Sequence, residues 1–341
     1  MQNRMVTLAL QGGGSHGAFT WGVLDRLLED GRMSFEGISG ASAGAMNAVV
    51  LAHGFHIGGR EGARAALSAF WKRIAIKDPF SFLSPEVTPG GANLLTHTTP
   101  AAMQAFLAMT RFFSPTQLNP LDINPLRDIL EEQVDFARLS KSNDIKLFIA
   151  ATKVSTGTLK IFRNRELTLD ALLASACLPS IHRPIEINGE AYWDGGLTAN
   201  PPIFPLLHLC SSHDLLVVLL HPCNRPGTPT SINDINQRLF EISFSSAFFT
   251  EVGGLALVKR EAERGMLAFG TLERRLKRLN MHLVEASELM SQLDALSKLN
   301  TKHSFIHGLY DAGRQAAEHW MEQHFHTLGR RSSFDLGRYL Q

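Results

Sequence analysis

The chain has 341 residues, of which 44% are hydrophobic and 19% charged, a composition typical of a globular protein. Its formal net charge of +1 gives no electrostatic support for a nucleic-acid partner. Three cysteines without a C-x-x-C spacing argue against a disulfide framework or a zinc ribbon and favour a reducing compartment. The N-terminus lacks the features of a secretory signal, and no uninterrupted apolar run approaches the ~18 residues of a membrane span. We therefore expect a cytoplasmic protein whose contact with a membrane would be peripheral.

The first fifty residues predict the start of an α/β sheet. Residues 5–10 form a short apolar run closed by glycines, which predicts a buried strand. Residues 17–29 carry apolar side chains at helical spacing, and Gly31 ends that helix. Residues 35–39 predict a second strand, and a second helix is expected from Ala43 onward. Strand, glycine loop, helix, strand, tight turn and helix is the order in which an α/β sheet begins.

Further along the chain, helical and strand patterns alternate up to about residue 225. Helices are expected at 60–75, 125–134 and 169–177, strands at 145–152, 159–163 and 214–221, a hairpin at 185–193 and a loop at 79–100. From about residue 231 to 279 the pattern is helical and rich in charged residues. A strand at 280–285 and a helix at 311–328 complete the prediction.

Residues 40–44 read Gly-Ala-Ser-Ala-Gly, a G-x-S-x-G pattern at the expected turn from strand to helix. A nucleophilic serine needs such a strained turn, which exposes its hydroxyl above the sheet edge, and small neighbours let the backbone turn sharply. The N-terminal amides of the next helix stabilise negative charge at that position. The same five residues also describe a plain tight turn, but the strand-turn-helix context makes Ser42 the candidate nucleophile.

Residues 12–17 read GGGSHG and fit G-x-G-x-x-G between a strand and a helix, which is also the context of a dinucleotide-binding loop. Such a loop expects an Asp or Glu about 20 residues on, at the end of the next strand. Here that strand ends in Ser39 and Gly40, and Glu36 lies at its start. Consecutive glycines also let backbone N–H groups converge on one oxygen. We favour an oxyanion hole, with the nucleotide-binding loop as the alternative.

A nucleophilic serine needs a base. A histidine is one choice, but an isolated residue such as His221 or His282 is more often structural. The better candidate is Asp194, which follows the predicted hairpin and precedes Gly195 and Gly196, although a plain Asp-Gly turn has the same appearance. Because an exposed Asp is a weak base, we expect burial to raise the pKa of Asp194.

GGGSHG, GASAG and the later Asp194-Gly195-Gly196 occur in the order seen in patatin-like phospholipases, and the chain resembles that family along most of residues 5–210. The resemblance implies a three-layer α/β/α fold with a mostly parallel central sheet. It also implies a catalytic domain over residues 5–225 and a mainly helical C-terminal extension, residues 226–341, packed on it. Two further stretches resemble the family, Ala174-Ser175-Ala176 with Leu178-Pro179 and Asn200-Pro201-Pro202.

The resemblance further implies a lipid acyl hydrolase in which Ser42 and Asp194 form a dyad without histidine. No metal or organic cofactor is implied, and the substrate would be a phospholipid or another fatty-acyl ester. Gly12, Gly13 and Gly14 would form the oxyanion hole, with Gly17, Gly40, Gly44, Gly195 and Gly196 supporting the motifs. His16 departs from the family, which more often has Arg or Lys there, so any charge contribution of this position is in doubt.

Two alternatives stay open, a nucleotide-binding α/β enzyme that uses GGGSHG and a non-catalytic lipid-binding or regulatory module. Two segments bear on membrane contact. Residues 101–113 (AAMQAFLAMTRFF) would lie on a bilayer, line an acyl-chain groove or form a core helix, and we favour the core helix. Residues 274–279 (RRLKRL) would contact anionic headgroups or, more commonly for such a run, form a solvated helix face.

Overall fold

The computed structural model of the protein describes residues 3–76, 109–110, 112–221, 227–264, 270–293 and 295–339. Its centre is an eight-stranded sheet with the order β5-β6-β3-β2-β1-β7-β8, in which β4 also pairs with β3. The strands are β1 (Arg4–Leu10), β2 (Met33–Gly40), β3 (Lys146–Lys153), β4 (Leu159–Arg163), β5 (Ile185–Ile187), β6 (Glu190–Asp194), β7 (Asp214–Leu219) and β8 (Asn280–Glu285). Neighbours from β3 through β8 in this order are parallel, whereas β4, β5 and β6 pair antiparallel. The mostly parallel sheet is confirmed.

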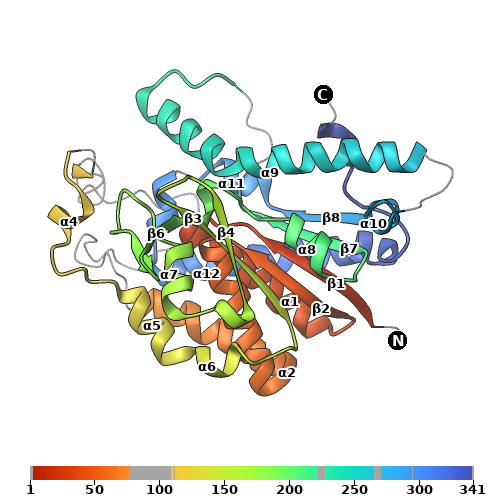
Figure 1. Ribbon diagram of the computed structural model, residues 1–341, viewed down its shortest axis with the longest axis horizontal. Coiled ribbons are helices and arrows are strands. Elements are labelled where there is room, and N and C mark those ends of the chain that lie inside the picture. The colour runs from red at the N-terminus through yellow and green to blue at the C-terminus, as the bar shows by residue number, and fades with distance from the viewer. Residues whose placement is uncertain are drawn as a thin grey trace.

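Helices cover both faces of this sheet and form the expected three layers (Figure 1). One face carries α1 (Gly17–Asp30), α2 (Ala43–Ile76) and α12 (His303–His324), and the other carries α8 (Phe204–Leu209), α9 (Ile232–Arg264) and α10 (Thr271–Arg278). Within β1, Leu8 and Leu10 enter the first core and Ala9 enters the second. Strands covered on both faces need apolar residues at nearly every position, which explains why β1 reads as a continuous apolar run.

Shorter elements connect these layers. The short α-helices are α4 (Pro115–Leu118), α5 (Pro125–Gln133), α6 (Phe136–Leu139), α7 (Leu169–Ser175) and α11 (Ser287–Ser291). The 3-10 helices are η1 (Gly14–His16), η4 (Asn164–Glu166), η5 (Gly195–Leu197), η6 (Ala295–Leu299), η7 (Phe325–Thr327) and η8 (Leu336–Tyr339).

The C-terminal residues share the sheet and the core of the residues before them. Strand β8 extends the sheet beside β7, and Phe305 of α12 is fully buried in the first core. Helices α1 and α12 approach closely at two glycines. A Cβ at Gly22 would lie 2.0 Å from the Tyr310 carbonyl oxygen, and a Cβ at Gly313 would lie 2.0 Å from the Phe19 carbonyl oxygen. The C-terminal region is packed on the α/β part, and a domain boundary at residue 226 stays a prediction.

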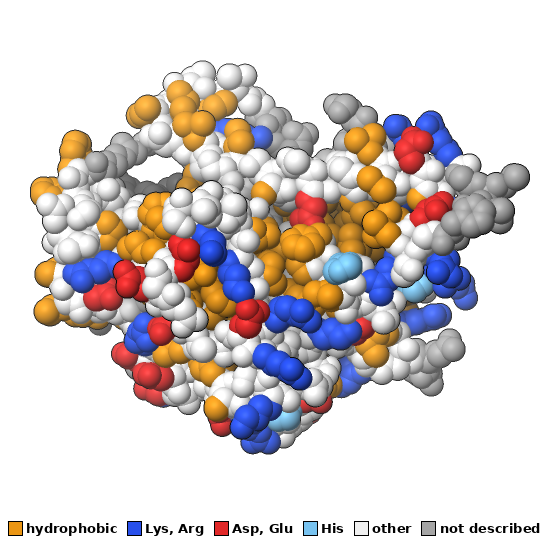
Figure 2. All heavy atoms as spheres, in the orientation of Figure 1, with side chains coloured by type: hydrophobic (Ala, Val, Ile, Leu, Met, Phe, Trp, Pro, Cys, Tyr) orange, Lys and Arg blue, Asp and Glu red, His pale blue; other side chains and the backbone are white. Residues whose placement is uncertain are grey.

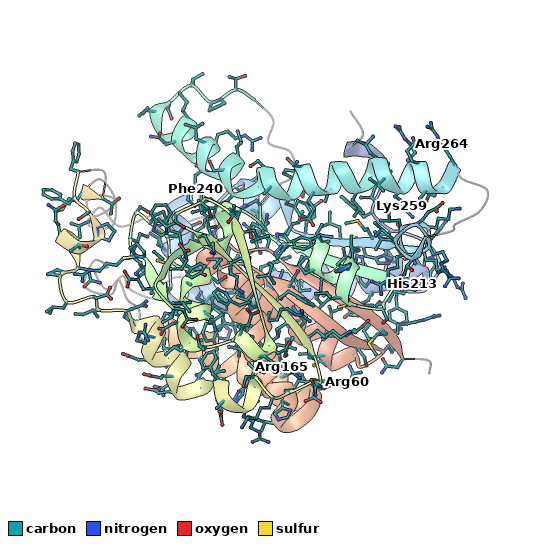
Figure 3. The ribbon with its side chains drawn as sticks, in the orientation of Figure 1. Arg60, Arg165, His213, Phe240, Lys259 and Arg264 are labelled. Atoms are coloured by element: carbon teal, nitrogen blue, oxygen red, sulfur yellow. The ribbon has the colours of Figure 1, made fainter. Side chains whose placement is uncertain are left out.

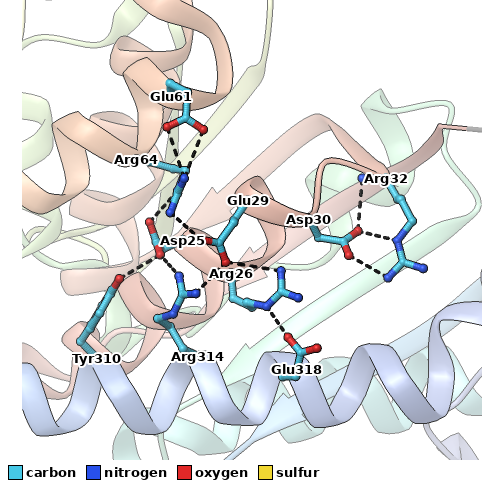
Figure 4. A network of polar contacts seen from close by, with 10 residues as sticks. All are labelled: Asp25, Arg26, Glu29, Asp30, Arg32, Glu61, Arg64, Tyr310, Arg314 and Glu318. Carbon is cyan, nitrogen blue, oxygen red and sulfur yellow. Dashed lines mark hydrogen bonds and ion pairs between the residues drawn. The ribbon is translucent and has the colours of Figure 1, made fainter. Parts of the chain in front are cut away.

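A network of charged side chains ties α1 to α2 and α12 (Figure 4). At its centre Asp25 of α1, 5% exposed, accepts hydrogen bonds from Arg64 Nε and the Tyr310 hydroxyl, both at 2.9 Å, and pairs with Arg314. Arg64 and Arg314 also bind Glu29, one turn further along α1. Because each charge has a partner of opposite sign, this network stabilises the packing of three helices that are far apart in sequence.

Several predicted elements differ from the structure in extent. The two helices expected from Ala43 and at 60–75 are confirmed: they make up α2, meet at the non-helical backbone of Gly58 and Gly59, and pack on each other where a Cβ at Gly54 would lie 2.6 Å from the Ala66 Cβ. Helix α12 begins at His303 instead of 311. The expected loop at 79–100 lies outside the described residues. Among those described, the stretch 234–264 is long and apolar enough to cross a membrane, with a mean hydropathy of 1.2 and 39% of its apolar window buried, which alone does not show a span.

Candidate active site

Ser42 lies in the turn between β2 and α2 with a left-handed φ of 52°. This strained conformation, uncommon for a residue with a side chain, is the one that the G-x-S-x-G pattern predicts. The Ser42 N–H is held by Ser175 of α7, at 3.0 Å from its carbonyl oxygen and 3.1 Å from its Oγ. Neither flanking glycine has room for a side chain. A Cβ at Gly40 would lie 2.6 Å from the Gly44 carbonyl carbon, and one at Gly44 would lie 2.1 Å from the Leu10 carbonyl oxygen.

The glycine loop that follows β1 lies against this turn. A Cβ at Gly12 would lie 2.7 Å from the Ser42 Cβ, so only glycine allows the two turns to come so close. Gly14 has a left-handed φ of 59°, and its Cβ position is 2.3 Å from the Lys298 carbonyl oxygen. The structure therefore brings the two glycine-rich motifs of the sequence together, and Lys298 of the C-terminal region packs against the glycine loop.

Asn200 holds the glycine loop from the other side. Its side chain is fully buried, its Oδ1 accepts the Gly12 N–H at 2.7 Å, and its Nδ2 donates to the Phe244 carbonyl oxygen at 3.1 Å. Gln11 completes the clamp, since its Nε2 donates to the Asn200 carbonyl oxygen and its Oε1 accepts the Leu220 N–H. Local sequence does not reveal this role of Asn200 and Gln11, because their partners are up to 209 positions away in the chain.

Asp194 ends β6, and its side chain is completely buried. Its main-chain N–H donates to the Cys177 carbonyl oxygen at 2.8 Å, and its Oδ1 accepts the Gly196 N–H at 2.7 Å. Gly195 permits this packing, because a Cβ there would lie 2.1 Å from the Ala150 carbonyl oxygen. In contrast, Asp194 Oδ2 has no hydrogen-bond partner within the described part of the chain. An unsatisfied carboxylate oxygen in a buried site is costly and calls for an explanation.

Burial raises the pKa of the Asp194 carboxyl to about 7, while the Gly196 N–H and the Ser42 hydroxyl lower it. The Ser42 hydroxyl therefore lies close enough to the Asp194 carboxyl to lower its pKa, although its geometry is not that of a hydrogen bond to Oδ2. A carboxylate of neutral pKa accepts a proton from a hydroxyl more readily than an exposed Asp, whose pKa is about 4. The burial expected from the sequence is present at this residue.

The remaining motif glycines also lie at close contacts. Gly17 is the first residue of α1 and lies against Ala43, the first residue of α2: a Cβ at Gly17 would lie 2.7 Å from the Ala43 Cβ. A Cβ at Gly196 would lie 2.6 Å from the Phe244 ring. These glycines bring the first turns of two helices together and admit α9 next to Asp194.

The two histidines considered as alternative bases have other partners. His221 is buried, and its Nε2 lies 2.9 Å from Lys298 Nζ. His282 belongs to a separate buried cluster, where its Nε2 lies 3.1 Å from Asp214 Oδ1. In the described residues, no hydrogen bond joins either ring to Ser42.

His16 brings no charge to the glycine loop. Burial, together with the nearby Lys298 ammonium, lowers the pKa of its ring to about 3, and its Nε2 lies 2.8 Å from Ser297 Oγ. The cation beside the loop is Lys298 of η6, whose Nζ lies 4.8 Å from the centre of the Phe240 ring, labelled in Figure 3. The motif pattern did not reveal Lys298, because it reaches the loop from the far end of the chain.

A dinucleotide-binding loop requires an Asp or Glu at the end of the next strand, but β2 ends in Ser39 and Gly40. Glu36, the acidic residue nearest to that place in the sequence, accepts the main-chain N–H groups of Ser211 and Ser212 and the Lys146 ammonium, all at 2.7–2.8 Å. These contacts hold the Glu36 carboxyl against Ser211, Ser212 and Lys146. Among the residues described, no group of three His, Cys, Asp or Glu side chains is arranged to hold a metal ion.

The segment 101–113 is described only at Met109, Thr110, Phe112 and Phe113, and the rest lies outside the described residues. Phe112 is 83% exposed and Phe113 46% exposed. For these two residues the favoured interpretation as a core helix is wrong, since neither side chain is covered.

The RRLKRL segment forms the C-terminal half of α10. Leu276 is buried in the second core, and Arg275 Nη1 donates to the carbonyl oxygens of Leu207 and His208 at the end of α8. This arrangement is that of a helix packed by its apolar side, with its charged side in solvent.

Part of this chain matches a known protein family. The family model described as patatin-like phospholipase matches residues 8–207, more than half of the chain. Two solved structures are similar in part. VipD from Legionella pneumophila is 13% identical, with 95% of this chain and 67% of that chain covered and a TM-score of 0.43. ExoU in complex with SpcU, from the type III secretion system of Pseudomonas aeruginosa, is 16% identical, with 81% and 66% covered and a TM-score of 0.32.

At these TM-scores neither likeness carries an argument, and the chain spans about two thirds of the length of each protein. No curated protein sequence matches this chain significantly. The family model covers both glycine-rich turns, Ser42 and Asp194. By that match, the chain belongs to the patatin-like phospholipase family.

Proposed function

We propose that the protein is a phospholipase A-like acyl hydrolase that cleaves fatty-acyl esters, with Ser42 as nucleophile and Asp194 as base. One observation carries the proposal: a strained serine turn adjoins a completely buried carboxyl whose pKa is raised to about 7. Burying an acidic group with one oxygen unpaired costs stability. Perturbed groups of this kind gather at functional sites, so reactivity explains Asp194 better than structure does.

In the proposed reaction, Ser42 Oγ attacks the ester carbonyl carbon while its proton passes to Asp194. The carbonyl electrons move onto the oxygen, and the tetrahedral intermediate then expels the alcohol, which takes the proton from Asp194. The acyl group is left as an ester of Ser42. A water attacks this ester and gives its proton to Asp194, and the fatty acid leaves as the proton returns to Ser42 Oγ.

The oxyanion would be stabilised by the glycine loop. The Gly12 N–H already donates to Asn200, so we assign the donating amides to Gly13 and Gly14. Gly12 contributes by its lack of a side chain, which admits the Ser42 turn. The amino end of α2, directly after Ser42, adds favourable potential at the same place.

A Ser42→Ala variant tests this function. The wild type should hydrolyse a short-chain soluble ester and react with a fluorophosphonate probe, whereas Ser42→Ala should do neither and keep the wild-type melting temperature. The matched control is Ser34→Ala, at the start of β2, the strand that precedes the Ser42 turn, and this variant should behave as wild type. Equal ester hydrolysis by Ser42→Ala would refute the assignment. A wild type that binds lipid vesicles without hydrolysing any ester would point to the non-catalytic module.

A further inference from the structure

The N-terminal part of α9 carries a row of apolar side chains without cover. Ile232, Ile235, Leu239 and Ile242 are spaced by three or four residues, so they lie on one side of the helix. All four are exposed, from 37% at Ile235 to 67% at Ile232. This part of α9 projects from the upper left of the molecule, and hydrophobic atoms gather on it (Figures 1 and 2). We call these four residues the α9 ridge.

The opposite side of the same helix is apolar as well. Phe244 and Phe248 are buried, and the Phe240 ring stacks on Phe244 with 4.4 Å between ring centres. The charged residues of this part of the helix, Asp234, Arg238 and Glu241, lie between the two apolar sides. An apolar side of a helix is normally covered, in a protein core or in lipid. Only the inner side of α9 is covered by the described part of this chain.

The outer side of α9 remains uncharged well beyond the ridge. Between residues 242 and 258 the only charged side chain is Glu251, which turns inward and accepts the main-chain N–H groups of Ile203 and Phe204. The exposed positions in this stretch are Ile242, Ser243, Ser246, Thr250, Gly254, Leu257 and Val258. Residues of both charges follow at the end of the helix, where Lys259 pairs with Glu263 and Arg264 with Glu261 (Lys259 and Arg264 are labelled in Figure 3). A long neutral, partly apolar face suits the boundary between lipid headgroups and acyl chains.

The inner side of α9 contacts the candidate active site. The Phe244 ring lies against Gly196, next to Asp194, and the Phe244 carbonyl oxygen accepts a hydrogen bond from Asn200. Ile242, the ridge residue nearest to Phe244 along the helix, is therefore about one helix diameter, roughly 10 Å, from the residues that hold the glycine loop, and Ile232 lies about 15 Å further along α9. A lipid that enters the site beside α9 would leave the bilayer without exposing its acyl chains to water, which is the costly step for such a substrate.

A second apolar projection lies at the same end of the molecule. Helix α4 and the N-terminal part of α9 both extend from the left side of the view in Figure 1, away from the N-terminus where β1 begins. Around α4, large apolar side chains are exposed, namely Phe112, Phe113, Leu121 and Ile123. Two apolar projections at one end of the molecule can both reach a broad, flat surface.

We propose that the α9 ridge docks the protein on the surface of a phospholipid bilayer, with the α4 projection as a second contact. The bilayer is the occupant that fits both the uncharged face of α9 and the neighbouring active site. The inference rests on the proposed function for its purpose, because docking would deliver the lipid ester to Ser42. Docking itself is measured without catalysis.

The test uses the full chain with Ser42→Ala, so that turnover does not alter the lipid. Partition onto phosphatidylcholine vesicles, with and without phosphatidylglycerol, is compared for this protein and for Leu239→Ser combined with Ile242→Ser. Losing two inserted side chains should weaken partition about tenfold or more. The control is Leu272→Ser on α10, a leucine of similar exposure (59%) outside the ridge, which should change partition less than about twofold. Equal partition of the ridge variant and its parent, with unchanged melting temperatures, would overturn the proposal.

Two further measurements separate the other outcomes. In the active chain, the ridge substitutions should reduce hydrolysis of vesicle lipid and spare a soluble short-chain ester. If the wild type hydrolyses no ester yet binds vesicles through the ridge, docking stands and the proposed function fails. If light scattering finds a dimer that the ridge substitutions split into monomers, the ridge is a contact between copies of this chain, and docking on a bilayer is overturned.

Discussion

Two buried aspartates, Asp25 in the helical layer and Asp194 at the end of strand β6 in the sheet, have opposite surroundings. Asp25 on α1 accepts hydrogen bonds from two arginines and a tyrosine, so its negative charge is balanced on all sides (Figure 4). The carboxyl of Asp194, at the end of β6, accepts one hydrogen bond, from the Gly196 N–H, and no described residue binds its second oxygen. Since burial raises the pKa of this carboxyl to about 7, it is about half protonated at neutral pH.

The different surroundings of Asp25 and Asp194 indicate different roles for the two regions. In the helical layer, charges from three helices neutralise one another and hold those helices together. At the end of β6, the fold places an acid that has no counter-ion among the described residues beside a strained serine turn. The same chemical change at the two aspartates should therefore have opposite effects on stability, and only one of the two changes should affect the proposed reaction.

The largest effect is expected from Asp194→Asn. This substitution nearly preserves shape, and its side-chain oxygen still accepts the Gly196 N–H, but the proton acceptor is lost. We expect kcat for a soluble ester to fall on the order of 10²-fold or more, the usual scale of general-base catalysis. Steady-state kinetics on the purified variant measures this. A kcat within about threefold of wild type would exclude Asp194 as the base.

The same variant should be more stable than wild type at alkaline pH. Because the pKa of Asp194 is about 7 in the fold, against 3.8 for an unperturbed aspartate, the wild type loses stability as the pH rises from about 4 to about 7. Asparagine has no such loss, so its advantage should be largest above pH 7, with an upper bound of about 4 kcal/mol, and should vanish near pH 4. Denaturant unfolding at both pH values measures it, and a variant less stable at pH 8 would contradict the inferred burial cost.

A smaller effect of opposite sign is expected from Asp25→Asn. Removing the charge leaves Arg64 and Arg314, both partly buried, with Glu29 as their one remaining shared carboxylate, so the free energy of unfolding should fall by about 2–3 kcal/mol. Both arginines are about a quarter exposed, and solvent screening keeps the loss below that of a fully buried pair. The kcat per folded molecule should stay at the wild-type value. A stabilised Asp25→Asn protein would mean that the network in Figure 4 contributes specificity and not stability.

The smallest and most diagnostic effect is on the pH profile. The proposed base acts only when ionised, so kcat/KM should rise with pH, with an apparent pKa of about 7. Near pH 7 the wild type should run at about half of its alkaline plateau. Asp25→Asn, as the control, should keep the same apparent pKa. An apparent pKa near 4 would show that Asp194 is solvated during catalysis, and the contrast between the two aspartates would then not hold in solution.

Much of the fold could be predicted from local patterns. The continuous apolar run at residues 5–10 and the helical spacing at 17–29 correspond to β1 and α1 within one residue at each end. The Asn-Gly pair at 188–189 lies in the hairpin between β5 and β6, with left-handed φ values at both residues. Such elements are predictable because their cause is local, either the periodicity of apolar side chains or the backbone freedom of a turn.

Other features were beyond local patterns. The two halves of α2 pack on each other after the chain reverses at Gly58 and Gly59, a contact between residues that no local pattern brings together. The start of α12 at His303 was missed because its first turns are covered by distant residues. The exposed α9 ridge was predicted only as part of a helical stretch, since a helix that is apolar on both sides gives no clear single face.

At the candidate site, the order of amino acids is enough to predict the motifs that the fold brings together: two glycine-rich turns, a serine between strand and helix, and an aspartate before two glycines. Spacing along the chain suffices for this, because each turn requires particular small residues at particular positions. The electrostatics of these residues come from the folded arrangement alone. The pKa of Asp194, the neutrality of His16 and the clamp from Asn200 to Gly12 all depend on groups that are remote in sequence and adjacent in space. Burial and distance set the energies of charges and hydrogen bonds, and neither is written in any short stretch of the chain.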